Sequence, residues 1–358
     1  MSAMQGPAYG AVDRLVHRVA FGGGPGPRLL RDLETRIYRD RIARAPVDAP
    51  VFVTALPRAG TTLLLEILSR HPDVVTHSYR DMPFVLSPLV WRKLSGRFRV
   101  QLERRERAHS DGVFVDADSP EAFEEVFWLA HAPEHYTARG IRLWPDSADD
   151  FSGPLAEFIR RLIASREAQG GAARRYVSKN NANIARLPAL ESAFGDGHVL
   201  VPFRPPLDHA ISLRNQHLRF LDMHGQSAFA EAYMRDIGHF EFGKLHRPIL
   251  FPGMEDILGT YSPGSLDYWI AYWLCAYRHI AGQRGVTFVD MQRFCATAPV
   301  AQLFDHLDLA ADGRASAAAA KLVRPMAQYD VEEKIDTGLA RRARALFEEL
   351  RMAGSCAP

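Results

Sequence analysis

The sequence predicts an α/β fold of three layers, in which helices flank a central and mostly parallel sheet. Short runs of apolar and β-branched residues alternate along the chain with longer segments of helical spacing, a pattern typical of parallel strands joined by helical crossovers. The run Ala49–Ala55 is almost continuously apolar, as expected for a strand covered on both faces. The chain has 358 residues, of which 47% are hydrophobic, and can therefore bury a large core. We expect a single domain over residues 1–358, with a helical N-terminal lead (1–47), an α/β core (48–300) and C-terminal helices (301–358).

Prolines, glycines and capping residues divide the chain into the other expected elements. A helix over Leu29–Ala43 follows a glycine cluster, and a helix over Thr61–Arg70 stops before Pro72, because proline disfavours helical backbone in the preceding residue. Ser119 and Pro120 have the residue types of an N-cap and a first helical position, so a helix is expected to begin there. The further expected strands and helices are Val74–Thr76, Tyr176–Ser178, His198–Phe203 and Thr287–Asp290, and Pro154–Glu167, Tyr268–Tyr277, Ala315–Lys321 and Leu339–Arg351.

The segment Val51–Leu68 carries the strongest functional signal. Its strand breaks at Pro57, turns at Gly60 and continues with helical spacing. The first turn of a helix leaves backbone N–H groups unpaired, and the helix dipole favours negative charge there. Arg58 adds a permanent cation, and two threonines add hydroxyl donors. The segment therefore predicts a site for a phosphate or a similar anion, although it lacks the lysine of the GxxxxGK[ST] loop of nucleotide hydrolases.

The run PRAGTTLL, residues 57–64, closely resembles the 5′-phosphosulfate loop of sulfotransferases that use 3′-phosphoadenosine 5′-phosphosulfate (PAPS). Two later segments resemble parts of that family in the same order. Residues 199–217 combine a strand, Arg204 and, eight residues later, Ser212, as does the family's 3′-phosphate element. Tyr176–Pro188 resembles the segment that brings a lysine, here Lys179, to the transferring group in tyrosylprotein and related sulfotransferases. The resemblance implies a P-loop-like fold and PAPS as co-substrate, and the last third of the chain carries no matching motif.

The resemblance also implies roles for the matched residues. Arg204 and Ser212 would bind the 3′-phosphate, and Lys179 a sulfuryl oxygen or the leaving group. Sulfuryl transfer asks mainly for positioning and electrostatic stabilisation, so fixed cations can suffice and no metal is expected. The alternative for Lys179 is a solvated side chain that begins a polar NNAN turn. The residues that would hold the 5′-phosphosulfate are Arg58, Ala59, Gly60, Thr61, Thr62 and Leu63.

The general base is harder to assign. In relatives with this kind of loop the base is a glutamate after the first helix, but counting from Arg58 that position holds Tyr79. A carboxylate or histidine near the acceptor is required, so we interpret Asp81 as the substitute and His77 as the second candidate. Asp81 pairing with Arg80, or capping a turn, is the alternative. His209 and His217, on either side of Ser212, and the aromatic residues of Tyr268–Tyr277 are interpreted as structural.

Two other functions stay open at this stage. A nucleotide kinase would need a Walker lysine, which the loop lacks, and a magnesium-binding carboxylate. A nucleotide-binding module without catalysis would keep Arg58, Arg204 and Ser212 but would need no base.

Composition adds limits rather than an activity. A net charge of +2 gives no support to nucleic acid as a partner. The three cysteines show no CxxC spacing, the N-terminus lacks a signal pattern, and the apolar helix Tyr268–Tyr277 is too short to span a membrane. We therefore expect a cytoplasmic protein. The resemblance implies a hydroxyl or amine acceptor, either a carbohydrate or a small metabolite. The sequence leaves the acceptor's identity and the oligomeric state open.

Overall fold

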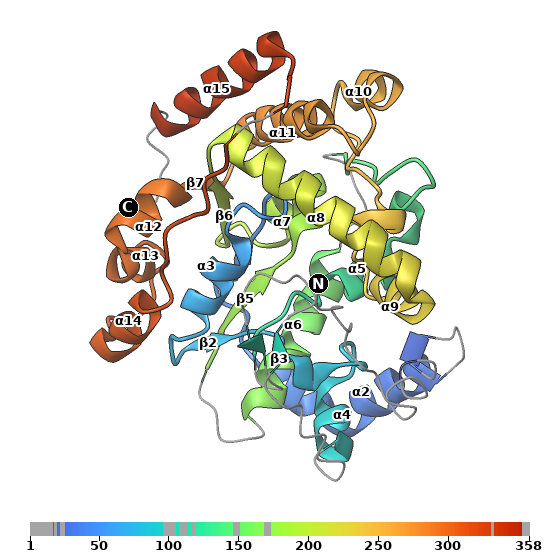
Figure 1. Ribbon diagram of the computed structural model, residues 1–358. Helices are drawn as coiled ribbons and strands as arrows, with labels where there is room; N and C mark the ends of the chain where they lie inside the picture. The colour runs from blue at the N-terminus through green and yellow to red at the C-terminus, as the bar shows by residue number, and fades with distance from the viewer. Residues whose placement is uncertain are drawn as a thin grey trace.

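A five-stranded sheet lies at the centre of the protein, and all of its strands are parallel (Figure 1). The computed structural model describes residues 17, 20–21, 26–95, 105–106, 114–115, 119–145, 151–167, 173–330 and 333–352. In spatial order the strands are β2 (Val74–Val75), β5 (Arg175–Lys179), β1 (Val51–Val53), β6 (His198–Phe203) and β7 (Val286–Asp290). A separate antiparallel pair joins β3 (Arg105–Glu106) to β4 (Phe114–Val115). The predicted α/β class with a P-loop-like parallel sheet is confirmed.

The strand order places three chain segments at one edge of the sheet. β1 pairs with β5 on one side and with β6 on the other, and Val53 lies opposite Lys179 and Leu200. The chain therefore leaves β1, β5 and β6 at adjacent carboxyl ends. Open parallel sheets bind ligands outside this edge, where the strand order reverses.

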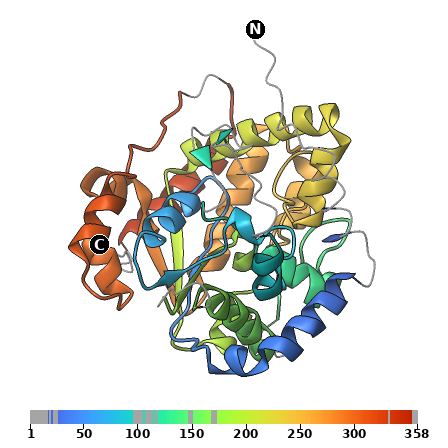
Figure 2. The ribbon, with the colours of Figure 1, turned by 90° about the horizontal axis from the view of Figure 1, so that it is seen from below.

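Alternate side chains of β1 enter two separate cores. Val51 and Val53 pack in one cluster with side chains of the helices α3, α12, α13 and α14, whereas Phe52 packs in the other. This alternation is the two-residue period of a strand. Figure 2 shows the orange-red C-terminal helices on one side of the sheet and the blue α2 on the other. Both faces of the strand are thus dry, which explains its continuous apolar sequence.

The helices surround the sheet and largely match the predicted ones. The predicted helices 29–43, 61–70, 154–167, 268–277, 315–321 and 339–351 all exist with somewhat different ends, and the aromatic residues of 268–277 are buried as expected. Among the described helices, none is both long enough and apolar enough to cross a membrane. The α-helices are α2 (Gly26–Arg44), α3 (Thr61–Leu68), α4 (Pro88–Ser95), α5 (Glu125–His131), α6 (Ser152–Glu167), α7 (Leu187–Ala193), α8 (Pro206–Gln226), α9 (Ala228–Asp236), α10 (Met254–Thr260), α11 (Leu266–Ala281), α12 (Met291–Thr297), α13 (Val300–His306), α14 (Gly313–Ala320) and α15 (Thr337–Met352). Short 3-10 helices are η1 (Tyr79–Asp81), η2 (Pro133–His135), η3 (Asn181–Ala185) and η4 (Gly243–Leu245).

The helix expected to begin at Ser119 and Pro120 was wrongly placed. Pro120 forms an antiparallel bridge with Ser78, and the N–H of Glu121 donates to the carbonyl of His77 over 2.9 Å. These backbone groups are thus used between two chain segments, and helix α5 begins only at Glu125. The favourable capping residues were overridden by this tertiary pairing.

Candidate active site

The loop between β1 and α3 has an unusual backbone. Arg58 and Gly60 adopt left-handed conformations, with φ of +68° and +109°. A non-glycine residue in this region is uncommon, and such strain gathers at ligand sites. A Cβ on Gly60 would lie 2.9 Å from Cε of Met291, so the turn also requires a close approach. Among the described residues, no side chain caps the N-terminus of α3, which leaves N–H groups of its first turn for a ligand.

His209 holds this loop from the neighbouring helix α8. Its Nε2 lies 2.8 Å from the carbonyl oxygen of Pro57, and its side chain is fully buried. Burial, with further contributions from Arg204 and Arg58, lowers the pKa of His209 to about 3. The imidazole is therefore neutral and donates a hydrogen bond to the loop, which agrees with the structural role expected from the sequence.

Two arginines and a serine meet where β1 and β6 end. Nε of Arg58 donates to Oγ of Ser212 on α8 over 3.2 Å, which brings the loop to the second predicted binding element. Arg204 follows β6 and is only 3% exposed. Its Nη2 donates to the carbonyl of Ala327, and its buried Nε has no hydrogen-bond partner among the described residues. Burial lowers the pKa of Arg204, and the charge of Arg58 adds to this effect. Two guanidinium groups this close form a site suited to anions.

Lys179 ends β5 at the same edge and is buried, with 9% exposure. The alternative of a solvated lysine is therefore excluded. Two residues after Lys179, the side-chain amide of Asn181 connects Thr61 to Glu241. Its Oδ1 accepts a hydrogen bond from Oγ1 of Thr61 over 3.2 Å, and its Nδ2 donates one to Oε1 of Glu241 over 3.0 Å. The hydroxyl of Thr61, predicted as a donor to the anion, thus donates its hydrogen bond to Asn181 instead. Thr62 is partly exposed.

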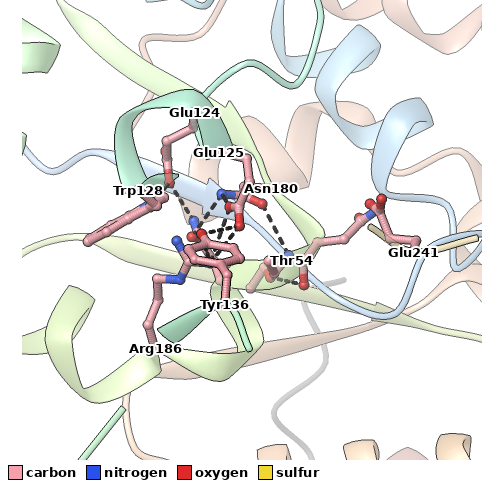
Figure 3. A network of polar contacts seen from close by, with 11 residues as sticks. Thr54, Glu124, Glu125, Trp128, Tyr136, Asn180, Arg186 and Glu241 are labelled. Atoms are coloured by element: carbon pink, nitrogen blue, oxygen red, sulfur yellow. Dashed lines mark hydrogen bonds and ion pairs between the residues drawn. The ribbon is translucent and has the colours of Figure 1, made fainter. Parts of the chain in front are cut away.

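A buried polar network fixes the NNAN segment, residues 180–183 (Figure 3). Nδ2 of Asn180 donates to Glu125 over 2.7 Å, and Nδ2 of Asn183 donates to Glu124 over 2.7 Å. Glu125 also pairs with the fully buried Arg186 over 3.0 Å, whose guanidinium lies over the Trp128 ring. These carboxylates on and beside α5 hold the turn in one conformation, so the turn that follows Lys179 is part of the core rather than a solvated loop.

Asp81 and His77, predicted as base candidates, lie in another buried cluster. Asp81 is 0% exposed and pairs with Arg92 over 2.7 Å and with Arg166 over 3.3 Å, and Nδ1 of His77 lies 3.5 Å away. Burial alone would raise the pKa of Asp81, but His77 and Arg92 lower it below its usual value. The carboxylate thus neutralises two arginines, and this arrangement argues for a structural role. The assignment of the base to either residue stays a prediction.

Sequence reasoning missed Glu241, the acceptor of the Asn181 hydrogen bond. Glu241 lies between Gly238 and Gly243, whose φ angles are +80° and +70°. A Cβ on Gly238 would lie 2.5 Å from Cγ of Glu125, and one on Gly243 2.7 Å from Nδ1 of His224. Two glycines framing one carboxylate were the available signal in the run GHFEFG. In the part of the chain that the structure describes, no three His, Cys, Asp or Glu side chains form a group that could hold a metal ion.

Comparisons with known proteins bear on the family and the fold of this chain. A sequence model of the sulfotransferase family matches residues 50–242, more than half of the chain, from the start of β1 to just beyond Glu241. The sulfotransferase STF9 from Mycobacterium avium is similar in structure, with a TM-score of 0.52 and 15% identity over 96% of this chain and 87% of that one. STF1 from Mycobacterium tuberculosis H37Rv gives a TM-score of 0.48 and 16% identity over 87% of this chain and 80% of that one. At such identity the likeness to STF9 supports the fold alone. No curated protein matches the sequence.

Proposed function

Because the chain belongs to the sulfotransferase family, we propose that it transfers the sulfuryl group of PAPS to a hydroxyl or amine acceptor by in-line displacement. The family membership supplies the reaction class. The choice of PAPS rests on the residues at the carboxyl edge of the sheet, and the acceptor class rests on the sequence resemblance.

The observation that carries the choice of donor is the contact between Arg58 and Ser212, beside Arg204. PAPS has two anionic groups, the 5′-phosphosulfate and the 3′-phosphate. The strained loop and the start of α3 suit the first group, because unpaired N–H groups and Arg58 converge there. The buried Nε of Arg204 and the hydroxyl of Ser212 suit the second. Two cationic subsites joined by one hydrogen bond support a nucleotide that carries charge at both ends.

Lys179 and Arg58 would supply the electrostatic part of catalysis. PAPS, when bound, provides an activated sulfur whose leaving group is a phosphate oxygen. Arg58 on the loop stabilises negative charge that builds up on that oxygen, and Lys179 at the end of β5 stabilises the sulfuryl oxygens. Fixed cations in a largely buried site act strongly, because they need not reorganise during the reaction. A carbohydrate or small-metabolite acceptor and a cytoplasmic location are further parts of this proposal.

The test is the conversion of PAPS to 3′-phosphoadenosine 5′-phosphate (PAP), measured by chromatography with a panel of sugar, phenol and amine acceptors. We expect PAP release that depends on an acceptor and falls at least about 100-fold in Arg58→Ala, with little change in the exposed control variant Arg219→Ala. If no acceptor releases PAP while ATP with Mg²⁺ yields ADP, the proposal is wrong and the kinase interpretation replaces it.

A further inference from the structure

A partly exposed carboxylate lies beside the groups assigned to the sulfuryl group. The side chain of Glu241 is 23% exposed, whereas Asp81 is 0% exposed. His239 and, to a smaller extent, the charge of Lys179 lower the pKa of Glu241. The oxygen Oε2 is buried, so an acceptor molecule can approach this carboxylate only on the side of Oε1, and the carboxylate lies close to the lysine.

Short hydrogen bonds fix Glu241 relative to the phosphosulfate loop. The side-chain amide of Asn181 lies between the loop and Glu241, since it accepts a hydrogen bond from Thr61 at the start of α3 and donates one to Oε1 of Glu241. The other oxygen, Oε2, lies 2.9 Å from Nδ1 of His239, whose ring stacks on Phe220. Figure 3 shows Glu241 at one end of the polar network, beyond Thr54 and Asn180 and away from Arg186. One amide side chain thus separates Glu241 from the first residue of the anion-binding helix.

The carboxylate of Glu241 is unprotonated before the reaction, as a proton acceptor must be. Burial alone would raise its pKa, but His239, Lys179 and the Asn181 hydrogen bond lower the pKa to about 2. The carboxylate is therefore ionised at neutral pH. When the sulfuryl oxygens engage Lys179, part of this lowering is cancelled, so the proton affinity of Glu241 rises once the donor is in place.

We propose that Glu241 is the general base of the reaction and that Asn181 is its positioning residue; this rests on the proposed function. As the acceptor oxygen or nitrogen forms its bond to sulfur, its proton passes to an oxygen of Glu241. The bond from sulfur to the 5′-phosphate oxygen breaks at the same time, and its electron pair stays on that oxygen of PAP. The protonated carboxyl then releases the proton from Oε1, since Oε2 is buried.

The experiment compares Glu241→Gln with the matched control Glu231→Gln. Glutamine keeps an oxygen that can accept from Asn181 but cannot take a proton at neutral pH. Glu231 on α9 is a partly exposed carboxylate 3.6 Å from Lys244, which makes it a suitable control for loss of charge. Single-turnover conversion of PAPS to PAP is measured near pH 8 with enzyme in excess and with phenol, 4-nitrophenol or water alone as the acceptor. PAP binding is measured by calorimetry in parallel.

Glu241→Gln should slow transfer to phenol and to water by about 100-fold or more, because both must lose a proton. Transfer to 4-nitrophenol, which is largely ionised near pH 8, should change only a few-fold, and PAP affinity and the Glu231→Gln rates should stay near wild type. Equal loss with both phenols, or loss of PAP affinity, would show a structural role and overturn the assignment. A normal water or phenol rate in Glu241→Gln would also overturn it. Failure of the wild-type protein both to bind PAP and to consume PAPS would instead refute the proposed function itself.

Discussion

Replacement of Arg204 by alanine should weaken the binding of PAP but not that of AMP. The two nucleotides differ only in the 3′-phosphate, which we assign to Arg204 and Ser212. Arg204 is 3% exposed, its Nη2 already donates to Ala327, and its buried Nε has no partner among the described residues, so Nε is a donor available to a ligand. One hydrogen bond from a charged group contributes about 1.5–3 kcal/mol. The Kd for PAP should therefore rise about 10- to 150-fold, while the Kd for AMP stays within about two-fold.

The assay is isothermal titration calorimetry of both nucleotides with wild type, Arg204→Ala and Arg219→Ala. Arg219 lies exposed on α8 and controls for the loss of one positive charge. Because the substitution also removes the contact with Ala327, unfolding curves must show that the variant is folded at the assay temperature. Equal losses for PAP and AMP would place the effect on the loop rather than on the 3′-phosphate, and unchanged PAP binding would refute the assignment outright.

Three further results are expected. Lys179→Ala should lower the turnover number by a factor of about 10²–10³ while the affinity for PAP stays nearly unchanged. Parallel losses of turnover in steady-state kinetics and of PAP affinity in calorimetry would mean that Lys179 only binds the nucleotide. Asp81→Asn should destabilise the fold by about 3–5 kcal/mol, because it removes the buried negative charge that neutralises Arg92. The folded fraction should keep its turnover number, and a selective loss of turnover would restore Asp81 as the base. The buried His209 and His217 have pKa values of about 3 and about 4, so below pH 6.5 the unfolded chain binds protons that the folded chain does not. These two rings should therefore lower stability with decreasing pH, together by roughly 3 kcal/mol at pH 5.5 relative to pH 8, and a flat denaturation midpoint over this range would contradict the assignment of both rings as neutral.

Local sequence patterns were enough to predict most of the fold and to bring together the residues of the candidate donor site. The strand–turn–helix around Gly60 and the strands that end at Lys179 and Arg204 are each encoded within a few neighbouring residues, so their types and positions were predictable. Their meeting at one edge follows from the parallel strand order. That the carboxyl ends of these strands are adjacent can be predicted without knowing the positions of individual side chains.

The acceptor side was not predictable in the same way. Glu241 reaches the site through Asn181, sixty residues earlier in the chain, and no local pattern encodes that contact. The prediction of Asp81 started from Tyr79, the position reached by counting from Arg58, and no local pattern encodes the arginines that pair with this carboxylate. The helix start at Ser119 was misplaced because the bridge between Pro120 and Ser78 competes with a locally favourable cap.

The most direct test of the account is calorimetric binding of PAP, ATP and AMP to the wild-type protein, with and without Mg²⁺. The account predicts that PAP binds tightest and that Mg²⁺ does not change its affinity, because Arg58, Arg204 and Ser212 provide both anion subsites without a metal. Tighter binding of ATP, dependent on Mg²⁺, would contradict the assignment of the donor site.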